Sequence, residues 1–552
     1  MEKTQSGAFF RFRKNETIGN ADAESDDRFL SQCFLDTGDL DALRDCEDSK
    51  RLVVGRTGAG KSALLKMLMD REEHVIALRP VELSLGYLAN SEVLRFFEDA
   101  GANLDVFYQL LWKHVIAVEL IRHRYKITNE ASQKSFLERL SGLFVKDRAK
   151  EQAIDYLRTW GANFWNETES RIKEVTHKIE TDLRASIFGS AAQVKLEAGA
   201  AEKLTEEEKR DVVTRGSRAV NQVQIASLSN VLKLLADDIF NDEQESHFVV
   251  IDDLDEHWVD DHLKHKLVRA LIETCRAFKQ LRRVKIVVAL RLDLLQRVIA
   301  ATRDSGFQSE KYEPMYLNLR WSENQLIELV NRRLDHLVKQ RYTSQTLTID
   351  DVFPAKVHQL RFRDFLCQRT FLRPRDAILL VNECLTRATD RQQVTAQMVV
   401  DAEASYSGKR IISLAEEWSG VYPLLSSYLQ VLVRRPMTFP LSELSKAALE
   451  DWAFKFLLED LQSLDPLAKA ARNLYIDEKG DAFEFSLKLV DALYEVGAVG
   501  LKPDAQSETF WSYYSDHRPA AGSLKPSSKV SVHATFWRAL GVSEKLPRMP
   551  SR

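Results

Sequence analysis

Glycine and proline are both scarce in this sequence, which has 21 glycines and 13 prolines among 552 residues. The shortage argues against long disordered or collagen-like stretches, and it favours helix because these two residues suit a helix interior least. Hydrophobic residues make up 44% and charged residues 29%, an ordinary globular composition with ample material for packed cores. At roughly 150 residues per domain, the length predicts about three or four domains.

Cysteine is also rare. The five cysteines lie far apart, and no two of them form a CxxC pair. An odd and scattered set excludes a disulfide framework and argues against a structural zinc site. A reducing compartment fits this pattern, so we expect a cytoplasmic protein.

Long hydrophobic runs are missing. The longest runs, such as residues 286–290, have the length of a strand and fall far short of the roughly 18 residues of a membrane span. The first residues, MEKTQSGAFFRFRKNE, contain no apolar core of a signal peptide, and we expect no membrane among the partners. An excess of positive charge is missing too, because the net charge is −4, so the chain as a whole is not a basic nucleic-acid binder.

Strand and helix candidates alternate along the chain. Five apolar runs have strand character, and segments of helical periodicity separate them. The runs lie within residues 51–55, 74–80, 247–258, 284–295 and 315–321. This alternation predicts an α/β fold with a mostly parallel sheet.

One short stretch carries the clearest chemical pattern. Residues 55–62 read GRTGAGKS, after a strand candidate and before a helix candidate, and they match G-x-x-x-x-G-K-[ST] in full. In this P-loop pattern, backbone N–H groups surround phosphate oxygens at a helix N-terminus. The residues are Gly55, Arg56, Thr57, Gly58, Ala59, Gly60, Lys61 and Ser62. We predict that Lys61 reaches the β- and γ-phosphates of a nucleotide and that Ser62 binds Mg²⁺.

A second strand candidate ends in acidic residues. Residues 247–251 read HFVVI and lead into Asp252 and Asp253, the expected form of a Walker B strand. We predict that Asp252 holds Mg²⁺ through water and that Asp253 polarises the attacking water as a general base. Asp255 and Glu256 are close alternatives for the base. A strand followed by a solvated acidic turn is the plain structural alternative.

Arg291 ends the strand candidate 284–291. The carboxyl ends of parallel strands face the ligand in open α/β sheets, so a cation at this position would sense the γ-phosphate. A solvated arginine at a strand end is the alternative.

A cluster of three arginines surrounds a predicted helix start further along the chain, at Arg369, Arg373 and Arg375. Pro374 suits the first turn of that helix. An arginine of this cluster would close over the nucleotide or act across a subunit boundary. The alternative is a surface cluster that pairs with Asp364 and Asp376.

The positions of these motifs predict how the chain is divided. We expect an N-terminal segment, residues 1–50, that leads into a P-loop ATPase domain of residues 51–321. A large helical insertion, about residues 91–245, interrupts that domain. Residues 322–417 are expected to form a helical lid, and residues 418–552 a C-terminal α+β module.

The C-terminal module has a winged helix as one interpretation. Residues 482–499 predict a helix that leads into VGLK, and TFWSYY is the expected hairpin partner that forms a wing. From His517 onward, seven lysines and arginines accompany a single acid, Glu544, and this excess would suit contacts with DNA phosphates. A basic tail that only keeps the chain soluble is the alternative.

Together, GRTGAGKSALL, VVIDDLDEHW, VVALRLD and FLRPRD resemble the bacterial P-loop ATPases around the KAP and STAND groups, within the AAA-like, additional-strand class. The segments AESDDRFLSQCFLDTGDLDAL and LVDALYEVGAVGL resemble one KAP-related family described as P-loop ATPases. The resemblance implies sensor 1 at Arg291, sensor 2 at Arg375, and a nucleotide site at Lys61, Ser62, Asp252 and Asp253. It also implies a role in bacterial defence against phage or plasmids. KAP proteins often carry membrane spans in the ATPase domain, where this chain has its helical block.

Other nucleotide-binding classes lack their required residues in this sequence. An ABC ATPase needs an LSGGQ-like signature shortly before Walker B, and the nearest match, LSGLF at residues 140–144, lies about a hundred residues too early. A GTPase would need an N-K-x-D motif, which is missing. A small-molecule kinase has no need for the second acid, Asp253.

We therefore expect an ATP-hydrolysing molecular switch that uses ATP and Mg²⁺ and changes its assembly state or partner affinity with nucleotide. A homo-oligomer or a protein effector is the expected partner. The alternatives are a DNA-associated ATPase that reads DNA with the C-terminal module, and a scaffold that holds ATP without hydrolysis. The paired acids argue against the scaffold.

Overall fold

The computed structural model forms two compact units. The first, here called the sheet unit, comprises residues 36–56 and 61–319, and the second, the helical unit, comprises residues 1–35, 57–60 and 320–552. The structure describes residues 11–82, 101, 103–127, 152–153, 155–157, 205–207, 209–210, 213–214, 225–302, 309–339, 346–459, 465–476, 481–514 and 519–543.

The sheet unit is built on a five-stranded sheet in the order β2-β3-β4-β1-β5. Every neighbouring pair is parallel, which confirms the predicted α/β fold with a parallel sheet. The strands are β1 (Leu52–Gly55), β2 (Val75–Leu78), β3 (His247–Ile251), β4 (Val284–Arg291) and β5 (Tyr316–Asn318). Strand β4 lies between β1 and β3, so the predicted P-loop strand and the predicted Walker B strand are not neighbours.

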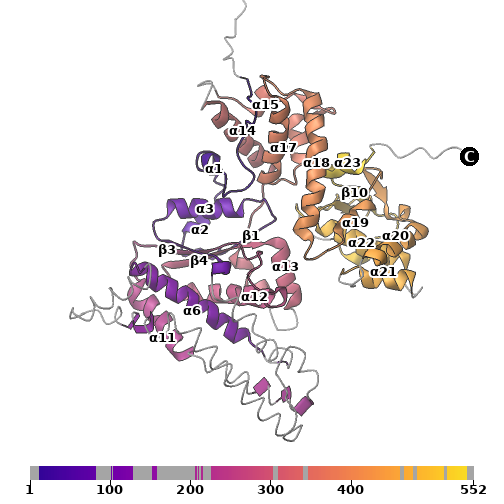
Figure 1. Ribbon diagram of the computed structural model, residues 1–552. Helices are drawn as coiled ribbons and strands as arrows, with labels where there is room; N and C mark the ends of the chain where they lie inside the picture. The colour runs from indigo at the N-terminus through magenta and orange to yellow at the C-terminus, as the bar shows by residue number, and fades with distance from the viewer. Residues whose placement is uncertain are drawn as a thin grey trace, which may run out of the picture. The chain divides into compact units, whose positions relative to one another are not determined.

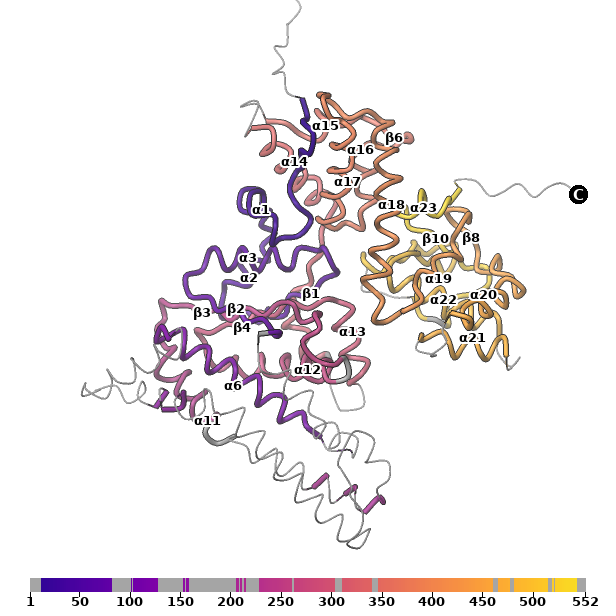
Figure 2. The backbone as a smooth tube through the Cα atoms, in the orientation of Figure 1, coloured from indigo at the N-terminus to yellow at the C-terminus, as the bar shows by residue number. Residues whose placement is uncertain are grey.

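Helices cover both faces of this sheet (Figures 1 and 2). Helices α2 (Asp39–Arg44) and α3 (Lys61–Arg71) lie on one face, and α6 (Asp105–Arg124), α12 (Asp261–Ala277) and α13 (Leu292–Ala301) lie on the other. Right-handed crossovers require this arrangement, because the chain moves in opposite directions along the sheet through α3 and through α12.

Burial on two faces explains the uninterrupted apolar runs of the sequence. All five residues of β3 are buried, as are the first seven residues of β4. Within the predicted helical stretch 91–245, the described helices are α6 and α11 (Ile225–Leu234), which continues into a π-helical turn over Leu235–Ile239. The remainder of that prediction falls mostly outside the described residues.

The helical unit begins with the N-terminal segment and the helices that follow β5. Helix α1 (Asp27–Cys33) packs against α14 (Glu323–Lys339), and a buried ion pair joins Arg333 to Asp26 at 2.6 Å. Helices α16 (Phe362–Gln368), α17 (Pro374–Arg387) and α18 (Ala396–Trp418) complete this part, with the short α15 (Ile349–Val352), β6 (Lys356–Val357) and β7 (Leu360–Arg361).

The C-terminal part of the helical unit contains an antiparallel sheet of order β8-β10-β9. Its strands are β8 (Thr438–Pro440), β9 (Val499–Lys502) and β10 (Lys529–Val532). Its helices are α19 (Leu425–Gln430), α20 (Lys446–Glu459), α21 (Ala468–Tyr475), α22 (Ala482–Glu495) and α23 (Trp537–Leu540).

The expected hairpin between VGLK and TFWSYY needs a correction. The ladder partner of β9 is β10, and the TFWSYY segment contributes a single bridge, from Phe510 to Leu501. The physical reason is side-chain alternation, since Val530 and Val532 of β10 both point into the module's core. Strand β10 has only four residues, too few for the sequence alone to indicate it.

Candidate nucleotide-binding site

The loop from Gly55 to Lys61 joins β1 to α3 and adopts a conformation that depends on glycine. Gly58 and Gly60 have φ angles of +79° and +100°, in the left-handed region that side chains with a Cβ disfavour. The Lys61 ammonium donates to the carbonyls of Gly55 and Arg56 at 3.1 and 3.2 Å. The ammonium therefore lies against the first turn of the loop, directly before helix α3.

Three consecutive carbonyls of this loop accept hydrogen bonds within the helical unit. The pairs are Arg373 Nη1 to Thr57 at 2.8 Å, the Arg375 N–H to Gly58 at 3.3 Å, and Trp321 Nε1 to Ala59 at 2.9 Å. No described peptide bond is cis, and in a planar trans peptide the N–H points opposite to the C=O. The N–H groups of residues 58–60 therefore point away from these three donors, as a phosphate cradle requires.

The structure brings together the two predicted Mg²⁺ ligands. The Ser62 hydroxyl lies close enough to the carboxylate of Asp252, which directly follows β3, to lower the pKa of that carboxyl. Burial raises the pKa of Asp252, and the hydrogen bond from the Asp253 N–H, the nearby Ser62 hydroxyl and the charge of Lys61 partly offset that rise. Strands β1 and β3 run in the same direction, so their carboxyl ends meet at one edge of the sheet although β4 separates them.

Asp253, the predicted base, has a strained backbone and a shifted pKa. Its φ angle is +60°, which is uncommon for a residue other than glycine. Residues with such backbone angles are concentrated at functional sites. Burial, followed by the charges of Asp252, Glu256 and Asp255, raises the pKa of Asp253 to about 6. A carboxylate with such a pKa is suited to accept a proton near neutral pH.

The two alternative bases lie on the same turn. Asp255 and Glu256 are both exposed, and the Glu256 N–H donates to the Asp253 carbonyl at 3.2 Å. Asp255 forms an ion pair with Arg291 at 3.0 Å.

Arg291 ends β4 at this same edge and is held by carboxylates. It forms two hydrogen bonds with Asp293, of 2.9 and 3.1 Å, in addition to its contact with Asp255. Asp293 in turn pairs with Arg297 at 3.2 Å. The predicted sensor 1 thus connects β4 to the acidic turn after β3.

Arg375, the predicted sensor 2, lies in the first turn of α17 within the helical unit. Its side chain packs against Gly58, where an added Cβ would come within 2.7 Å of the Arg375 Cβ. Its Nε donates to the carbonyl of Ala21 at 3.2 Å. This close approach is a second reason, besides the φ angle, why position 58 requires glycine.

The alternative of a surface cluster is wrong for Arg369 and Arg373, because both are buried, although its pairing with Asp376 is present. Arg373 pairs with the buried Asp376 at 2.9 Å, and Arg369 pairs with Glu403 at 2.8 Å. Asp364 instead pairs with Arg361, outside the cluster.

Two residues near the candidate site, Trp321 and Arg79, were not predicted from the sequence, and Arg373 was predicted only as a member of the arginine cluster. Trp321 and Arg373 contact the loop, and Arg79 lies near enough to Asp253 to lower its pKa slightly. Arg79 follows Leu78, which pairs with Ile251 just before the acids, so the parallel register carries a signal that was available from the strand assignments. Trp321 had no comparable local signal.

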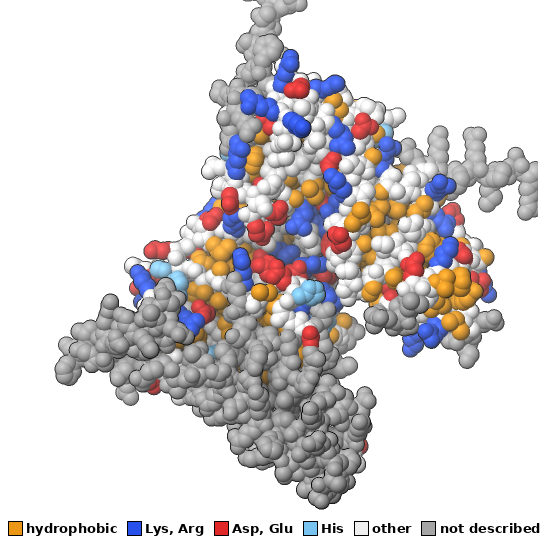
Figure 3. Space-filling model, in the orientation of Figure 1, with side chains coloured by type: hydrophobic (Ala, Val, Ile, Leu, Met, Phe, Trp, Pro, Cys, Tyr) orange, Lys and Arg blue, Asp and Glu red, His pale blue; other side chains and the backbone are white. Residues whose placement is uncertain are grey.

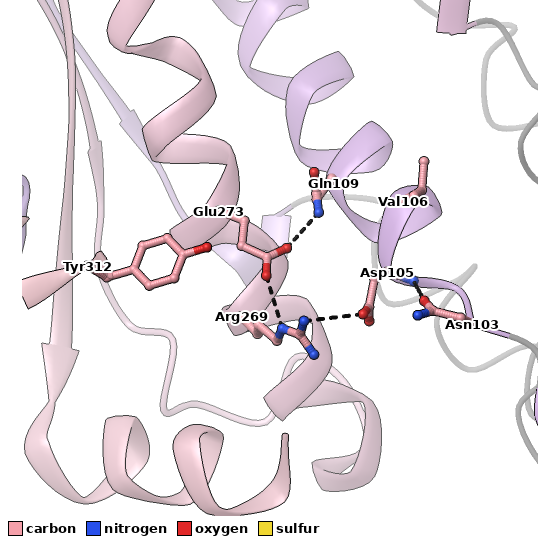
Figure 4. Close-up of a pocket in the computed structure, with 7 residues that line it drawn as sticks. All are labelled: Asn103, Asp105, Val106, Gln109, Arg269, Glu273 and Tyr312. Carbon is pink, nitrogen blue, oxygen red and sulfur yellow. Dashed lines mark hydrogen bonds and ion pairs between the residues drawn. The ribbon is translucent and has the colours of Figure 1, made fainter. Parts of the chain in front are cut away.

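A separate pocket of about 570 Å³ lies in the sheet unit beside α6 and α12 (Figure 4). Arg269 contacts Asp105 at 3.4 Å and Glu273 at 3.0 Å, and Gln109 donates to Glu273 at 2.6 Å. None of the predicted site residues lines it. The pocket is therefore distinct from the site at the carboxyl ends of the strands.

Neither a metal cluster nor a membrane span appears in the described part of the chain. No group of three or more His, Cys, Asp or Glu residues there has the geometry to hold a metal ion. Among the described helices, none is long and apolar enough to cross a membrane.

The parallel sheet, with helices on both faces and a glycine-rich loop between β1 and α3, is consistent with the P-loop NTPase α/β fold. Comparisons with known proteins give more particular similarities. A family model described as the FunZ-associated C-terminal helical domain matches residues 324–415, which extend from α14 into α18.

The chain is also 22% identical, over 559 residues, to a protein of Escherichia coli (strain K12) described as a transposon gamma-delta 80.3 kDa protein. That similarity covers 96% of this chain and 68% of the relative. Among solved structures, that of the Aeropyrum pernix ORC2 protein, described as ADPNP-ADP complexes, is similar over 90% of this chain and 89% of its own, with 10% identity and a TM-score of 0.32. A TM-score of this size does not establish a common fold.

Proposed function

We propose that this chain is an ATP-binding and ATP-hydrolysing molecular switch. The observation that carries the proposal is the contact between Ser62, which directly follows the P-loop lysine, and Asp252, which directly follows β3. P-loop NTPases hold Mg²⁺ with this pair of residue types. The contact forms only because the sheet topology brings two distant segments to one edge.

The residues present fit Mg²⁺ and a nucleoside triphosphate. Ser62 and Asp252 offer the oxygen ligands that Mg²⁺ prefers. The N–H groups of residues 58–60 and the Lys61 ammonium offer donors to phosphate oxygens. When bound, Mg²⁺ would neutralise charge on the β- and γ-phosphates, and the protein's own part is to position the phosphates and the attacking water.

Hydrolysis, in preference to a passive scaffold, is supported by Asp253. Its carboxylate adjoins Asp252 and has a pKa of about 6, whereas Glu256 is exposed and Asp255 is paired with Arg291. We therefore assign the general base to Asp253 ahead of Glu256. Arg291 is the proposed sensor 1, because it ends a strand at the same edge, and Arg375 the proposed sensor 2.

The additional-strand class is supported by the sheet order. Strand β4, which ends in Arg291, lies between the P-loop strand β1 and the strand β3 that precedes Asp252. The KAP- and STAND-like assignment, a cytoplasmic location and a role in defence against phage or plasmids rest on the motif resemblance. The similarity to a protein described as transposon-borne agrees with a mobile-element context.

For the C-terminal module we propose a winged-helix fold that recruits protein. Helix α22 precedes the β9–β10 hairpin, with β8 beside β10, as a winged helix requires. The exposed residues of α22 include Glu484 and Lys488, and Asp481 caps it, so this face has no excess of positive charge for DNA phosphates. Exposed hydrophobic side chains on α20 and α21, which include Phe454, favour a protein partner (Figure 3).

The decisive experiment is Lys61→Ala, with Lys66→Ala on the same helix α3 as the matched control. We expect Lys61→Ala to lose ATP binding by at least about 100-fold in Kd while its circular dichroism spectrum stays unchanged, because one charge-assisted contact to phosphate is lost. Isothermal calorimetry with Mg²⁺ and a non-hydrolysable ATP analogue measures this. Equal affinity in wild type and a folded Lys61→Ala variant would exclude the assignment.

A further inference from the structure

Residues 369–373, here called the coupling segment, contact the P-loop at one end. Arg373 is only 4% exposed, and its side chain donates to the Thr57 carbonyl at 2.8 Å. Its guanidinium also contacts the carboxylates of Asp376 at 2.9 Å and Glu417 at 3.5 Å. A guanidinium held by two buried carboxylates has little freedom to turn, so it determines the direction of the Thr57 carbonyl and of the N–H that follows it.

The middle of the coupling segment is strained. Phe371 and Leu372 have φ angles of +48° and +51°, and the turn they form is closed by the Arg373 N–H, which donates to the Thr370 carbonyl at 2.9 Å. Neither residue is a glycine, so the side chain of each makes the left-handed conformation unfavourable. Strain of this kind persists only where surrounding contacts enforce it.

Those contacts come from the C-terminal module. The Phe371 ring stacks on the His533 imidazole, with centroids 4.1 Å apart and planes 16° from parallel. The guanidinium carbon of Arg373 also lies over the Phe371 ring, 4.7 Å from its centroid. Thr535 donates its hydroxyl to the Arg369 carbonyl at 2.8 Å. Residues that follow β10 therefore hold Arg369, directly before the strained turn, and Phe371 within it.

His533 itself is fixed in one orientation. Its Nδ1 accepts from the Thr535 N–H at 3.2 Å, so the proton resides on Nε2, which contacts the Tyr513 hydroxyl at 2.9 Å. A displaced β10 would move the imidazole, release the Phe371 ring and remove the support of the turn. The contacts thus run without a gap from β10 through Phe371 and Arg373 to the Thr57 carbonyl.

We propose that the coupling segment links the position of the C-terminal module to the conformation of the P-loop, with Arg373 as the positioning residue. The consequence of this inference rests on the proposed function. A partner that displaces β10 would alter the affinity of the chain for ATP, and ATP would alter its affinity for the partner by the same factor. The signal reaches the phosphate cradle through one carbonyl, without a contact from His533 to nucleotide.

Two mild variants test the proposal in the full-length chain. His533→Asn keeps an acceptor for the Thr535 N–H but removes the ring that stacks on Phe371, and Phe371→Leu removes the same stacking from the other side. Trp452→Ala, in the same hydrophobic core but on α20, is the control for a general loss of module stability. Hydrogen exchange is measured by mass spectrometry on peptides that cover residues 56–62, without nucleotide.

Each of the two variants should speed exchange of these loop amides about fivefold or more, and the double variant should do no more than either single one. Trp452→Ala should leave the loop unchanged. In calorimetry, the dissociation constant for the ATP analogue should shift by a similar factor in the two variants. Unchanged loop exchange in both variants, or additive effects in the double variant, would overturn the coupling. If the wild-type chain binds no ATP, the proposed function fails, while the exchange result still decides on the coupling.

Discussion

Replacement of Asp253 by asparagine should separate the role of this residue in ATP hydrolysis from its effect on the free energy of unfolding. With a pKa of about 6, the carboxylate is about nine-tenths ionised at pH 7, half ionised at pH 6 and about one-tenth ionised at pH 5. If Asp253 is the general base, kcat/KM for ATP should fall about tenfold between pH 7.5 and pH 5. Asp253→Asn should lower kcat by about 10²–10⁴-fold and abolish this acid limb, since the amide does not accept the proton.

The same substitution should stabilise the sheet unit. The pKa of Asp253 in the folded state is raised above the ordinary value of 3.8. The contribution of its protonated carboxyl to the free energy of unfolding is therefore complete below pH 3.8 and is lost as the pH rises through about 6. At pH 7.5 the ionised carboxylate therefore opposes folding. The shift corresponds to about 3 kcal/mol, and solvent screening of this partly exposed group reduces the expected gain to about 1–2 kcal/mol. Asparagine also tolerates a φ of +60° better than most residues.

Steady-state hydrolysis from pH 5 to pH 8 and urea unfolding at pH 7.5 measure the two effects. The control is Asp70→Asn, which replaces an exposed carboxylate on α3. The titration of the nucleotide itself affects the hydrolysis rates of this variant and of Asp253→Asn equally. A variant Asp253→Asn that keeps both its turnover and its acid limb would refute the reasoning. Loss of turnover in Glu256→Gln instead would move the base to the exposed acid.

Two further predictions concern the same sheet. Burial lowers the pKa of His247 to about 4, so the folded state favours the neutral ring, and stability should be lost as the pH falls from 6.5 towards 4. His247→Phe should therefore reduce the loss of hydrogen-exchange protection in β3 between pH 7 and pH 5. An equal loss of protection in this variant and in the wild type would contradict the prediction. Arg291→Ala should lower kcat by about 10²–10³-fold with a smaller change in ATP affinity, if Arg291 meets charge that develops on phosphate; a folded variant with normal kcat would leave the arginine only its structural pairing with Asp293.

The parallel sheet was predictable because its signals are local. Strands covered on both faces need unbroken apolar runs, and residues 247–251 and 284–291 show such runs in the sequence. The glycine-rich loop is equally local, since the residues that require φ above zero are its own glycines. Strand β10 was not predictable in this way, because KVSV is short and its partner strands lie far away along the chain. Lys529 pairs with Lys502, 27 residues earlier, and with Pro440, 89 residues earlier.

By itself, the sequence determined which residues can carry the proposed chemistry: the P-loop lysine and serine, and the acids that follow an apolar strand. Only the tertiary structure decided how they are arranged. The order of the strands brought Ser62 to Asp252, and the environment of the turn set the pKa of Asp253. The orientation of the loop carbonyls depends on Trp321 and Arg373, which lie 262 and 316 residues from their partners. Such contacts arise from packing between distant segments, and no local pattern of side chains encodes them.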